Sequence, residues 1–242
     1  GDHRDLHSFP TRRSSDLGVR RSVTIVATSD QPATVRVRAA FMACAVAEYF
    51  RDQGKDVVLM MDSVTRFAMA SREIGLAAGE PPTSKGYTPS VYSLLPRLLE
   101  RAGRFPTASI TGIFTVLVEG GDMEDPIADA VRSILDGHIV LTRKLAQDRH
   151  FPAIDLLQSV SRLTSRLQDA EHKTLAGRFI QTLALYRNSE DMIRIGAYPR
   201  GSHEETDFAI DMIDRLNDYL RQAIEDPCSI EAARHALEEL FQ

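Results

Sequence analysis

Apolar runs separated by polar turns predict alternating strands and helices over the first part of the chain. Residues 57–61 (VVLMM) have no polar interruption, which predicts a strand buried on both faces. Further strands are predicted at 22–28, 109–118 and 137–141, where β-branched and other apolar residues cluster. Apolar residues recur at helical spacing between these runs, for example over 35–50. The alternation favours an α/β fold in which helices flank a parallel sheet.

Beyond Thr164 the hydrophobic pattern changes to that of amphipathic helices with few strand features. We therefore predict two structured parts, an α/β part over 18–165 and a helical part over 166–242. The predicted helices of the second part cover 167–186, 207–224 and 229–240.

The segment Gly1–Leu17 has many charges and no apolar period, and an ordered pattern begins abruptly at Gly18. It lacks the apolar stretch of a signal peptide. Residues 7–17 (HSFPTRRSSDL) resemble the translation of a sequencing adapter joined to a truncated gene. We therefore interpret residues 1–17 as foreign to the fold, with a disordered tail as the alternative.

Composition and charge narrow the class of protein. The chain has 242 residues, of which 43% are hydrophobic and 26% charged, as in an ordinary globular protein. A net charge of −5 without a basic stripe argues against a dedicated nucleic-acid binder. Cys44 and Cys228 lie far apart without metal-ligand spacing, which indicates buried apolar residues in a reducing compartment.

Candidate chemistry appears where the 57–61 run ends in Asp62. In open α/β sheets, ligands bind at the carboxyl ends of the strands. An aspartate at that edge can hold a Mg²⁺-bound water beside the phosphates of a nucleotide. A carboxylate that merely ends a core strand is the alternative, so the neighbouring residues must decide.

Five motifs carry a resemblance to a known family. Phe151–Arg162 (FPAIDLLQSVSR) resembles the signature of the rotary ATPase α/β superfamily. Asp62–Ala68 (DSVTRFA), Pro89–Gly103 (PSVYSLLPRLLERAG) and Asp136–Ala146 (DGHIVLTRKLA) resemble the branch that powers type III protein export. Within that branch, Ile195–Ser202 (IGAYPRGS) is more similar to flagellar members than to injectisome members.

The resemblance implies a partial RecA-like parallel sheet with flanking helices, followed by a C-terminal α-helical domain. Residues 18–165 would form the C-terminal part of the RecA-like ATPase domain, and 166–242 the helical domain. The implied activity is ATP hydrolysis by a hexameric ring that drives flagellar protein export, with ATP and Mg²⁺ as cofactors. The alternatives are an injectisome ATPase and a catalytically silent interaction module.

The resemblance also implies roles for four residues. Asp62 matches the Walker B aspartate that binds Mg²⁺ through a water, and Arg66 matches an arginine that senses the γ-phosphate. Phe151 matches the aromatic residue that packs against adenine, where the family more often has tyrosine. Arg162 matches the arginine finger that a neighbouring subunit inserts beside the γ-phosphate. A surface ion pair for Arg66, core packing for Phe151 and an interface salt bridge for Arg162 are the alternatives.

The partners implied by the resemblance are further copies of the chain, a central-stalk protein, the export apparatus, and export substrates and chaperones that dock on the helical domain. The loop Glu80–Pro89 matches the sleeve that faces the central channel, and Gly120–Asp125 matches the acidic loop that contacts the stalk. Both could instead be solvated loops. The implied location is cytoplasmic, at the inner face of the bacterial inner membrane, with peripheral association only.

One expected motif is absent from the 242 residues. A P-loop needs G-x-x-x-x-G-K-[ST], and the Gly54-Lys55 pair is followed by Asp56 at a helix stop. In the family, the P-loop and the catalytic glutamate precede the strand predicted at 22–28. We therefore expect a C-terminal fragment that does not turn over ATP by itself.

Overall fold

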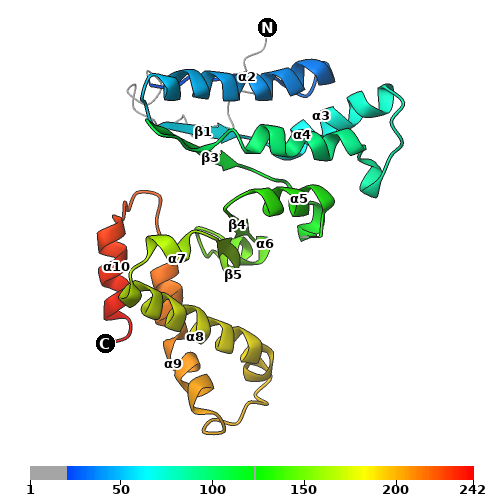
Figure 1. Ribbon diagram of the computed structural model, residues 1–242. Coiled ribbons are helices and arrows are strands. Elements are labelled where there is room, and N and C mark those ends of the chain that lie inside the picture. The colour runs from blue at the N-terminus through cyan, green and yellow to red at the C-terminus, as the bar shows by residue number, and fades with distance from the viewer. Residues whose placement is uncertain (1–20, 123) are drawn as a thin grey trace. The chain divides into compact units, whose positions relative to one another are not determined.

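The computed structural model describes residues 21–122 and 124–242, in two compact units that divide after Ile134 (Figure 1). The segment Gly1–Leu17 lies outside the described residues. The first unit contains α2 (Ala33–Asp52), β1 (Val57–Met61), α3 (Val64–Ala77), η3 (Ser84–Gly86), α4 (Pro89–Leu99), β2 (Gly103–Arg104), β3 (Ser109–Phe114), η4 (Glu119–Gly121) and α5 (Pro126–Ile134). The second unit contains β4 (Gly137–Leu141), α6 (Arg143–Gln147), β5 (Ile154–Ser161), α7 (Thr164–Leu167), α8 (Ala170–Arg194), α9 (Glu204–Leu220) and α10 (Ile230–Glu239).

The sheet of the first unit is built on a parallel pair, β1 and β3. Val57 lies opposite Ile110 and Met61 opposite Phe114, and β2 pairs antiparallel with the start of β3. The chain crosses from β1 to β3 through α3 and α4, because parallel strands need a long connection. Helix α2 packs against β1, β3 and α3, so the predicted α/β class with flanking helices is confirmed.

The prediction that β1 is buried on both faces is wrong for the described residues. Leu59 is buried, but Val58 and Met60 are 63% and 61% exposed. Successive strand residues point to opposite faces, and α2 covers the face of Leu59. Val58, Met60 and Ile113 lie on the other face, which no described element buries. A continuous apolar run therefore marks a strand with two apolar faces, not two covered faces.

The predicted strand at 22–28 is also wrong, because the structure shows an irregular segment there. Val23 and Val26 are exposed, and β1 pairs with β3 rather than with this segment. A β-branched sequence forms a strand only when a neighbouring strand completes its hydrogen bonds and packing. Within the described residues this segment has no such neighbour.

The helices of the first unit begin and end where local sequence features place them. Ser63 precedes α3, and its hydroxyl accepts a hydrogen bond from the N–H of Arg66 at 3.3 Å, as an N-cap residue does. Gly54 follows α2 and Gly79 follows α3, both with positive φ, which glycine adopts without steric cost. The predicted helices at 35–50 and after Asp62 are confirmed.

The second unit combines a two-stranded sheet with a helical bundle. β4 and β5 pair antiparallel, with an irregularity in register between His138 and Val140. α8 packs along α9, and α10 packs on α8 (Figure 1). The three helices bury a common apolar cluster of Phe179, Leu183, Met212, Leu216, Leu237 and Leu240. The amphipathic helices predicted for this region are confirmed, whereas the domain boundary at 165/166 stays a prediction.

We predict that Leu216→Ala lowers the free energy of unfolding by about 3 kcal/mol, because it removes a fully buried side chain and leaves a cavity. Urea denaturation followed by circular dichroism measures the loss. Ile224→Ala is the matched control, since Ile224 is 89% exposed and its truncation changes stability by less than about 0.5 kcal/mol. Equal effects of the two substitutions would contradict this packing.

Among the helices within residues 21–122 and 124–242, none is long and apolar enough to cross a membrane.

Candidate functional site

Asp62 directly follows β1, at the carboxyl end of the parallel pair that β1 forms with β3. Its side chain is exposed, and its Oδ1 accepts a hydrogen bond from the hydroxyl of Thr115 at 2.8 Å. The Asp62–Ser63 peptide bond is cis. The carboxylate is thus held at the sheet edge where α/β proteins bind ligands.

Arg66 lies in the first turn of α3, four residues after Asp62, and its side chain is exposed. Asp62 and Arg66 therefore flank the start of the same helix. An anion at that point is favoured by the positive end of the helix dipole and by the guanidinium. The structure brings these two predicted site residues together in the first unit.

Phe151 and Arg162 belong to the second unit, where they lie beyond opposite ends of β5. Phe151 is 53% exposed, and its carbonyl oxygen accepts a hydrogen bond from the N–H of Gln222 at 2.9 Å. Arg162 is exposed, and its N–H donates to the carbonyl oxygen of Asp136 at 2.8 Å. Both backbones are anchored while the side chains face outward. Their roles toward a nucleotide stay predictions.

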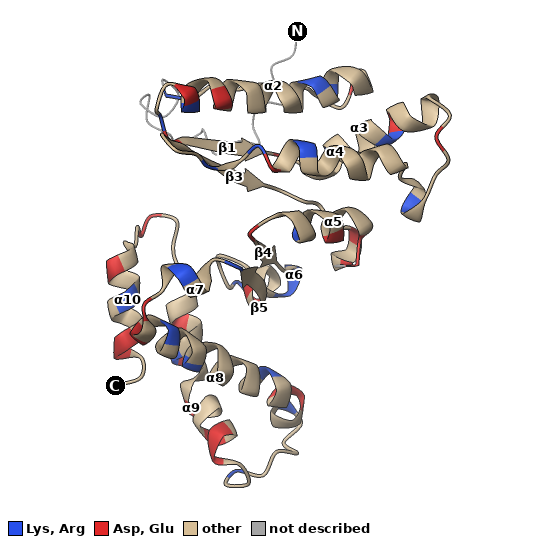
Figure 2. Ribbon diagram, viewed as in Figure 1, with Lys and Arg blue, Asp and Glu red and all other residues tan. Residues whose placement is uncertain are grey.

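The two loops predicted to face the channel and the stalk contact each other. The Nζ of Lys85 lies 2.7 Å from an oxygen of Asp122 and 3.5 Å from one of Asp125. The hydrogen bond between Lys85 and Asp122 raises the pKa of the lysine and lowers that of the aspartate. Figure 2 shows the basic position in the loop between α3 and α4 and the acidic positions that lead into α5. A surface ion pair therefore joins the loops.

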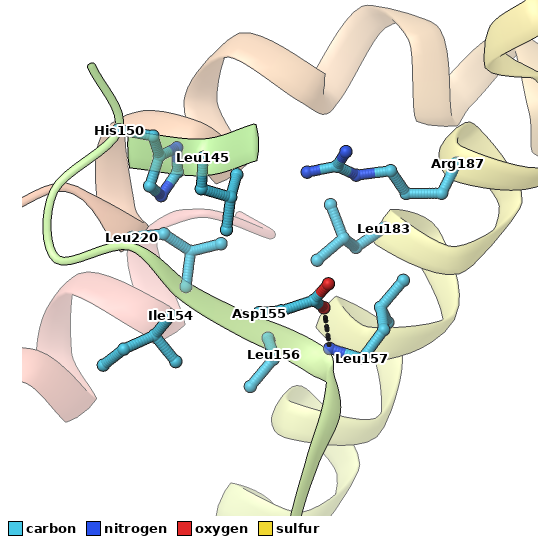
Figure 3. A pocket seen from close by; sticks show the side chains of 9 residues that line it. All are labelled: Leu145, His150, Ile154, Asp155, Leu156, Leu157, Leu183, Arg187 and Leu220. Carbon is cyan, nitrogen blue, oxygen red and sulfur yellow. Dashed lines mark hydrogen bonds between the residues drawn. The ribbon is translucent and has the colours of Figure 1, made fainter. Parts of the chain in front are cut away.

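A small pocket lies between β5 and α8 in the second unit (Figure 3). Leucines dominate its walls, and His150, Asp155 and Arg187 supply the polar groups. Burial lowers the pKa of His150, and the positive charges of Arg221 and Arg187 lower it further. The imidazole is therefore neutral at pH 7. None of the predicted site residues lines this pocket.

The predicted site residues fit ATP and Mg²⁺ in their chemistry. Mg²⁺ takes oxygen ligands, keeps several waters, and is commonly held by one or two carboxylates together with substrate phosphates. The exposed carboxylate of Asp62 is of this type, and the described residues contain no cluster of three metal-ligating side chains. The exposed ring of Phe151 offers a flat face of the kind that stacks on a purine.

Sequence reasoning missed Thr115, Lys85 and His150. Thr115 lies inside the strand predicted at 109–118, whereas β3 ends at Phe114, so a search for polar residues at the predicted strand ends does not find it. No local pattern marks Lys85 or His150, because their partners lie in other segments of the chain.

Comparison with known sequences decides the family. Residues 2–161, more than half of the chain, match the nucleotide-binding domain of the ATP synthase alpha/beta family. The chain belongs to this family. Residues 168–239 match the C-terminal domain of the T3SS EscN ATPase. The family resemblance seen in the motifs is confirmed, and the first match also spans most of the segment that we predict to be foreign.

The similar proteins come from flagella and from type III secretion systems. The chain is 53% identical over 237 residues to the flagellum-specific ATP synthase of Bacillus subtilis, covering 98% of this chain and 54% of that protein. It is 49% identical over 238 residues to the SPI-2 type 3 secretion system ATPase of Salmonella typhimurium, covering 98% of this chain and 55% of that protein. The chain thus spans about half the length of these family members.

Solved structures agree with this assignment. The assembled ATPase EscN of enteropathogenic E. coli superposes with a TM-score of 0.86 at 51% identity, covering 90% of this chain and 53% of that one. EscN in complex with its central stalk EscO superposes with a TM-score of 0.81 at 50% identity, covering 90% and 52%. The fold of this chain is therefore that of the ATP synthase alpha/beta family.

Proposed function

We propose that the full-length protein hydrolyses ATP to drive flagellar type III protein export. The observation that carries this proposal is Asp62, an exposed carboxylate at the carboxyl end of a parallel strand, within a domain of the ATP synthase alpha/beta family. Flagellum-specific ATP synthases are among the most similar proteins, which favours the flagellar system. Inspection of the adjoining genes would distinguish this protein from an injectisome ATPase, because flagellar and injectisome genes would not both surround it.

In the proposed reaction, water attacks the γ-phosphorus, the bond to the β,γ-bridging oxygen breaks and ADP leaves, while fixed positive charges stabilise the charge that develops on the phosphate oxygens. Asp62 would hold Mg²⁺ through a water of the metal's shell, and the bound metal would neutralise charge on the phosphates. Arg66 senses the γ-phosphate, and the ring of Phe151 packs against adenine. Arg162 of one subunit acts on the nucleotide of its neighbour, so the active form is a ring of copies.

The similar structures support the proposed partners. EscN assembles, and it binds a central stalk protein. We extend this to a hexamer in which the Glu80–Pro89 and Gly120–Asp125 loops face the channel and the stalk. The helical domain would receive export substrates and chaperones. The proposed location is the cytoplasmic face of the inner membrane, with peripheral association.

We predict that the isolated 242-residue chain releases no phosphate from ATP, while the full-length protein does. The chain has Asp62, Arg66 and Arg162 but no G-x-x-x-x-G-K-[ST] sequence. The backbone N–H groups and the lysine of that sequence are what hold the phosphates of a bound nucleotide. A steady-state phosphate-release assay on both proteins checks this. Mg²⁺-dependent release by the isolated chain that Asp62→Asn abolishes would contradict the prediction.

A further inference from the structure

Thr115 makes a short contact with the proposed metal-binding carboxylate. Its hydroxyl oxygen lies 2.8 Å from Oδ1 of Asp62 and 3.4 Å from the carbonyl oxygen of Met61. A threonine hydroxyl has one hydrogen to donate. The shorter distance and the negative charge of the acceptor assign that hydrogen to Asp62.

The register of the sheet explains this contact. Met61 is the partner of Phe114, so the next residues along the two strands, Asp62 and Thr115, lie side by side. The N–H of Thr115 donates to the carbonyl oxygen of Met61 at 3.0 Å, which continues the pairing beyond the strand end. The two side chains leave the sheet on the same face because parallel neighbours in register share a face.

Further hydrogen bonds fix the backbone on both sides of Thr115. The N–H of Val64 donates to the carbonyl oxygen of Thr115 at 2.9 Å. The hydroxyl of Thr65 accepts from the N–H of Leu117 at 2.8 Å. The turn that carries Asp62 is thus joined to the segment after β3 at several points, and Thr115 has little freedom to move away.

We propose that Thr115 is a positioning residue for Asp62, and this proposal rests on the function proposed above. Its hydroxyl holds one carboxylate oxygen, Oδ1, and so selects one orientation of the Asp62 side chain. The second oxygen, Oδ2, would then be the one that accepts a hydrogen bond from a water of bound Mg²⁺. Groups that orient the ligands of a metal typically contribute 10- to 100-fold to metal affinity or activity.

The test uses the full-length protein with its phosphate-binding sequence present. Thr115→Val keeps the shape of the side chain and removes the hydroxyl, whereas Thr115→Ser keeps the hydroxyl. Thr111→Val is the matched control, because Thr111 is an exposed residue of the same strand that lies opposite Val58, four residues before Thr115. Thermal melting followed by circular dichroism verifies that each variant folds.

The main readout is the binding of Mn²⁺, an oxygen-seeking substitute for Mg²⁺, titrated by electron paramagnetic resonance in the presence of ADP. We expect Thr115→Val to raise the Kd for Mn²⁺ by about 10- to 100-fold. Thr115→Ser and Thr111→Val should bind Mn²⁺ within about two-fold of the unmodified protein. The Mg²⁺ concentration needed for half-maximal turnover should rise in Thr115→Val and stay nearly unchanged in Thr115→Ser and Thr111→Val.

Asp62→Asn separates the failure of this proposal from that of the proposed function. If Asp62→Asn weakens Mn²⁺ binding and Thr115→Val does not, Thr115 has no positioning role and the proposal is overturned, while the role of Asp62 stands. If Asp62→Asn also leaves Mn²⁺ binding unchanged, the assignment of Asp62 to the metal fails, and the proposal for Thr115 fails with it. Equal weakening by Thr115→Ser and Thr115→Val would likewise overturn a role for the hydroxyl.

Discussion

Arg162→Ala in the full-length protein is expected to lower ATP turnover by about 10³-fold or more while ATP binding stays nearly intact. A guanidinium that acts as an arginine finger stabilises mainly the charge that develops in the transition state. The expected loss, about 4 kcal/mol in activation free energy, is at the lower end of what such fingers supply in other phosphoryl-transfer enzymes. Arg162→Lys should rescue poorly, since an ammonium group cannot reproduce the planar fork of the guanidinium.

Mixing of subunits tests whether Arg162 acts across a subunit boundary. Arg162→Ala subunits keep an intact phosphate site, and subunits without the P-loop lysine keep an intact Arg162. Mixed rings can therefore place an intact phosphate site beside an intact finger, and turnover should partly return. If both variants enter mixed rings and no activity returns, Arg162 acts within its own subunit or has no catalytic role. Arg166→Ala serves as a control, because Arg166 is also an exposed arginine and lies four residues after Arg162, within α7.

Asp62→Asn in the full-length protein is expected to lower Mg²⁺-dependent turnover by about 10³-fold or more. A metal ion that neutralises developing charge on a phosphoryl group contributes several kcal/mol, and the neutral amide holds that ion weakly. The substitution isolates the charge of Asp62, because the amide oxygen can still accept the hydrogen bond from Thr115. Phosphate release measured over a range of Mg²⁺ concentrations gives the loss.

Asp56→Asn is the matched control for this experiment. Asp56 precedes β1 at the opposite end of the strand, where it accepts hydrogen bonds from the N–H and the hydroxyl of Ser109 at 2.9 and 2.7 Å. These hydrogen bonds lower the pKa of Asp56 and favour its ionised form. Asp56 is therefore a charged aspartate, as a metal ligand must be, but it lies at the end of β1 opposite to Asp62. Its substitution should leave turnover unchanged. A comparable loss in both variants would show that Asp62 contributes through folding rather than through the metal.

Expectations from local sequence were confirmed where the determining interactions are local. Helical periodicity, the Ser63 N-cap and the glycines that follow α2 and α3 involve residues within a few positions of one another. The strand at 137–141 was likewise predicted with its observed bounds. The position of Asp62 at a strand end follows from the apolar run before it. These features arise from backbone preferences and capping, which act over one or two turns.

Expectations failed where the neighbours of a segment decide its state. The 22–28 segment has the composition of a strand, but a strand needs a partner to complete its hydrogen bonds, and no described strand provides one. Val58 and Met60 belong to an apolar run, but burial depends on which elements cover each face of the sheet. Neither outcome can be predicted from the local sequence pattern alone.

The motifs of the chain therefore suffice to assign the family, and its hydrophobic pattern predicts the α/β class, the helical second part and the place of Asp62 at a strand end. Which residues meet at that place depends on contacts between distant segments. Thr115 lies 53 residues after Asp62, and Lys85 lies 37 residues before Asp122, yet each pair is in hydrogen-bond contact. Such contacts follow from strand register and from the packing of loops, which depend on the whole arrangement of elements rather than on the propensity of any one segment.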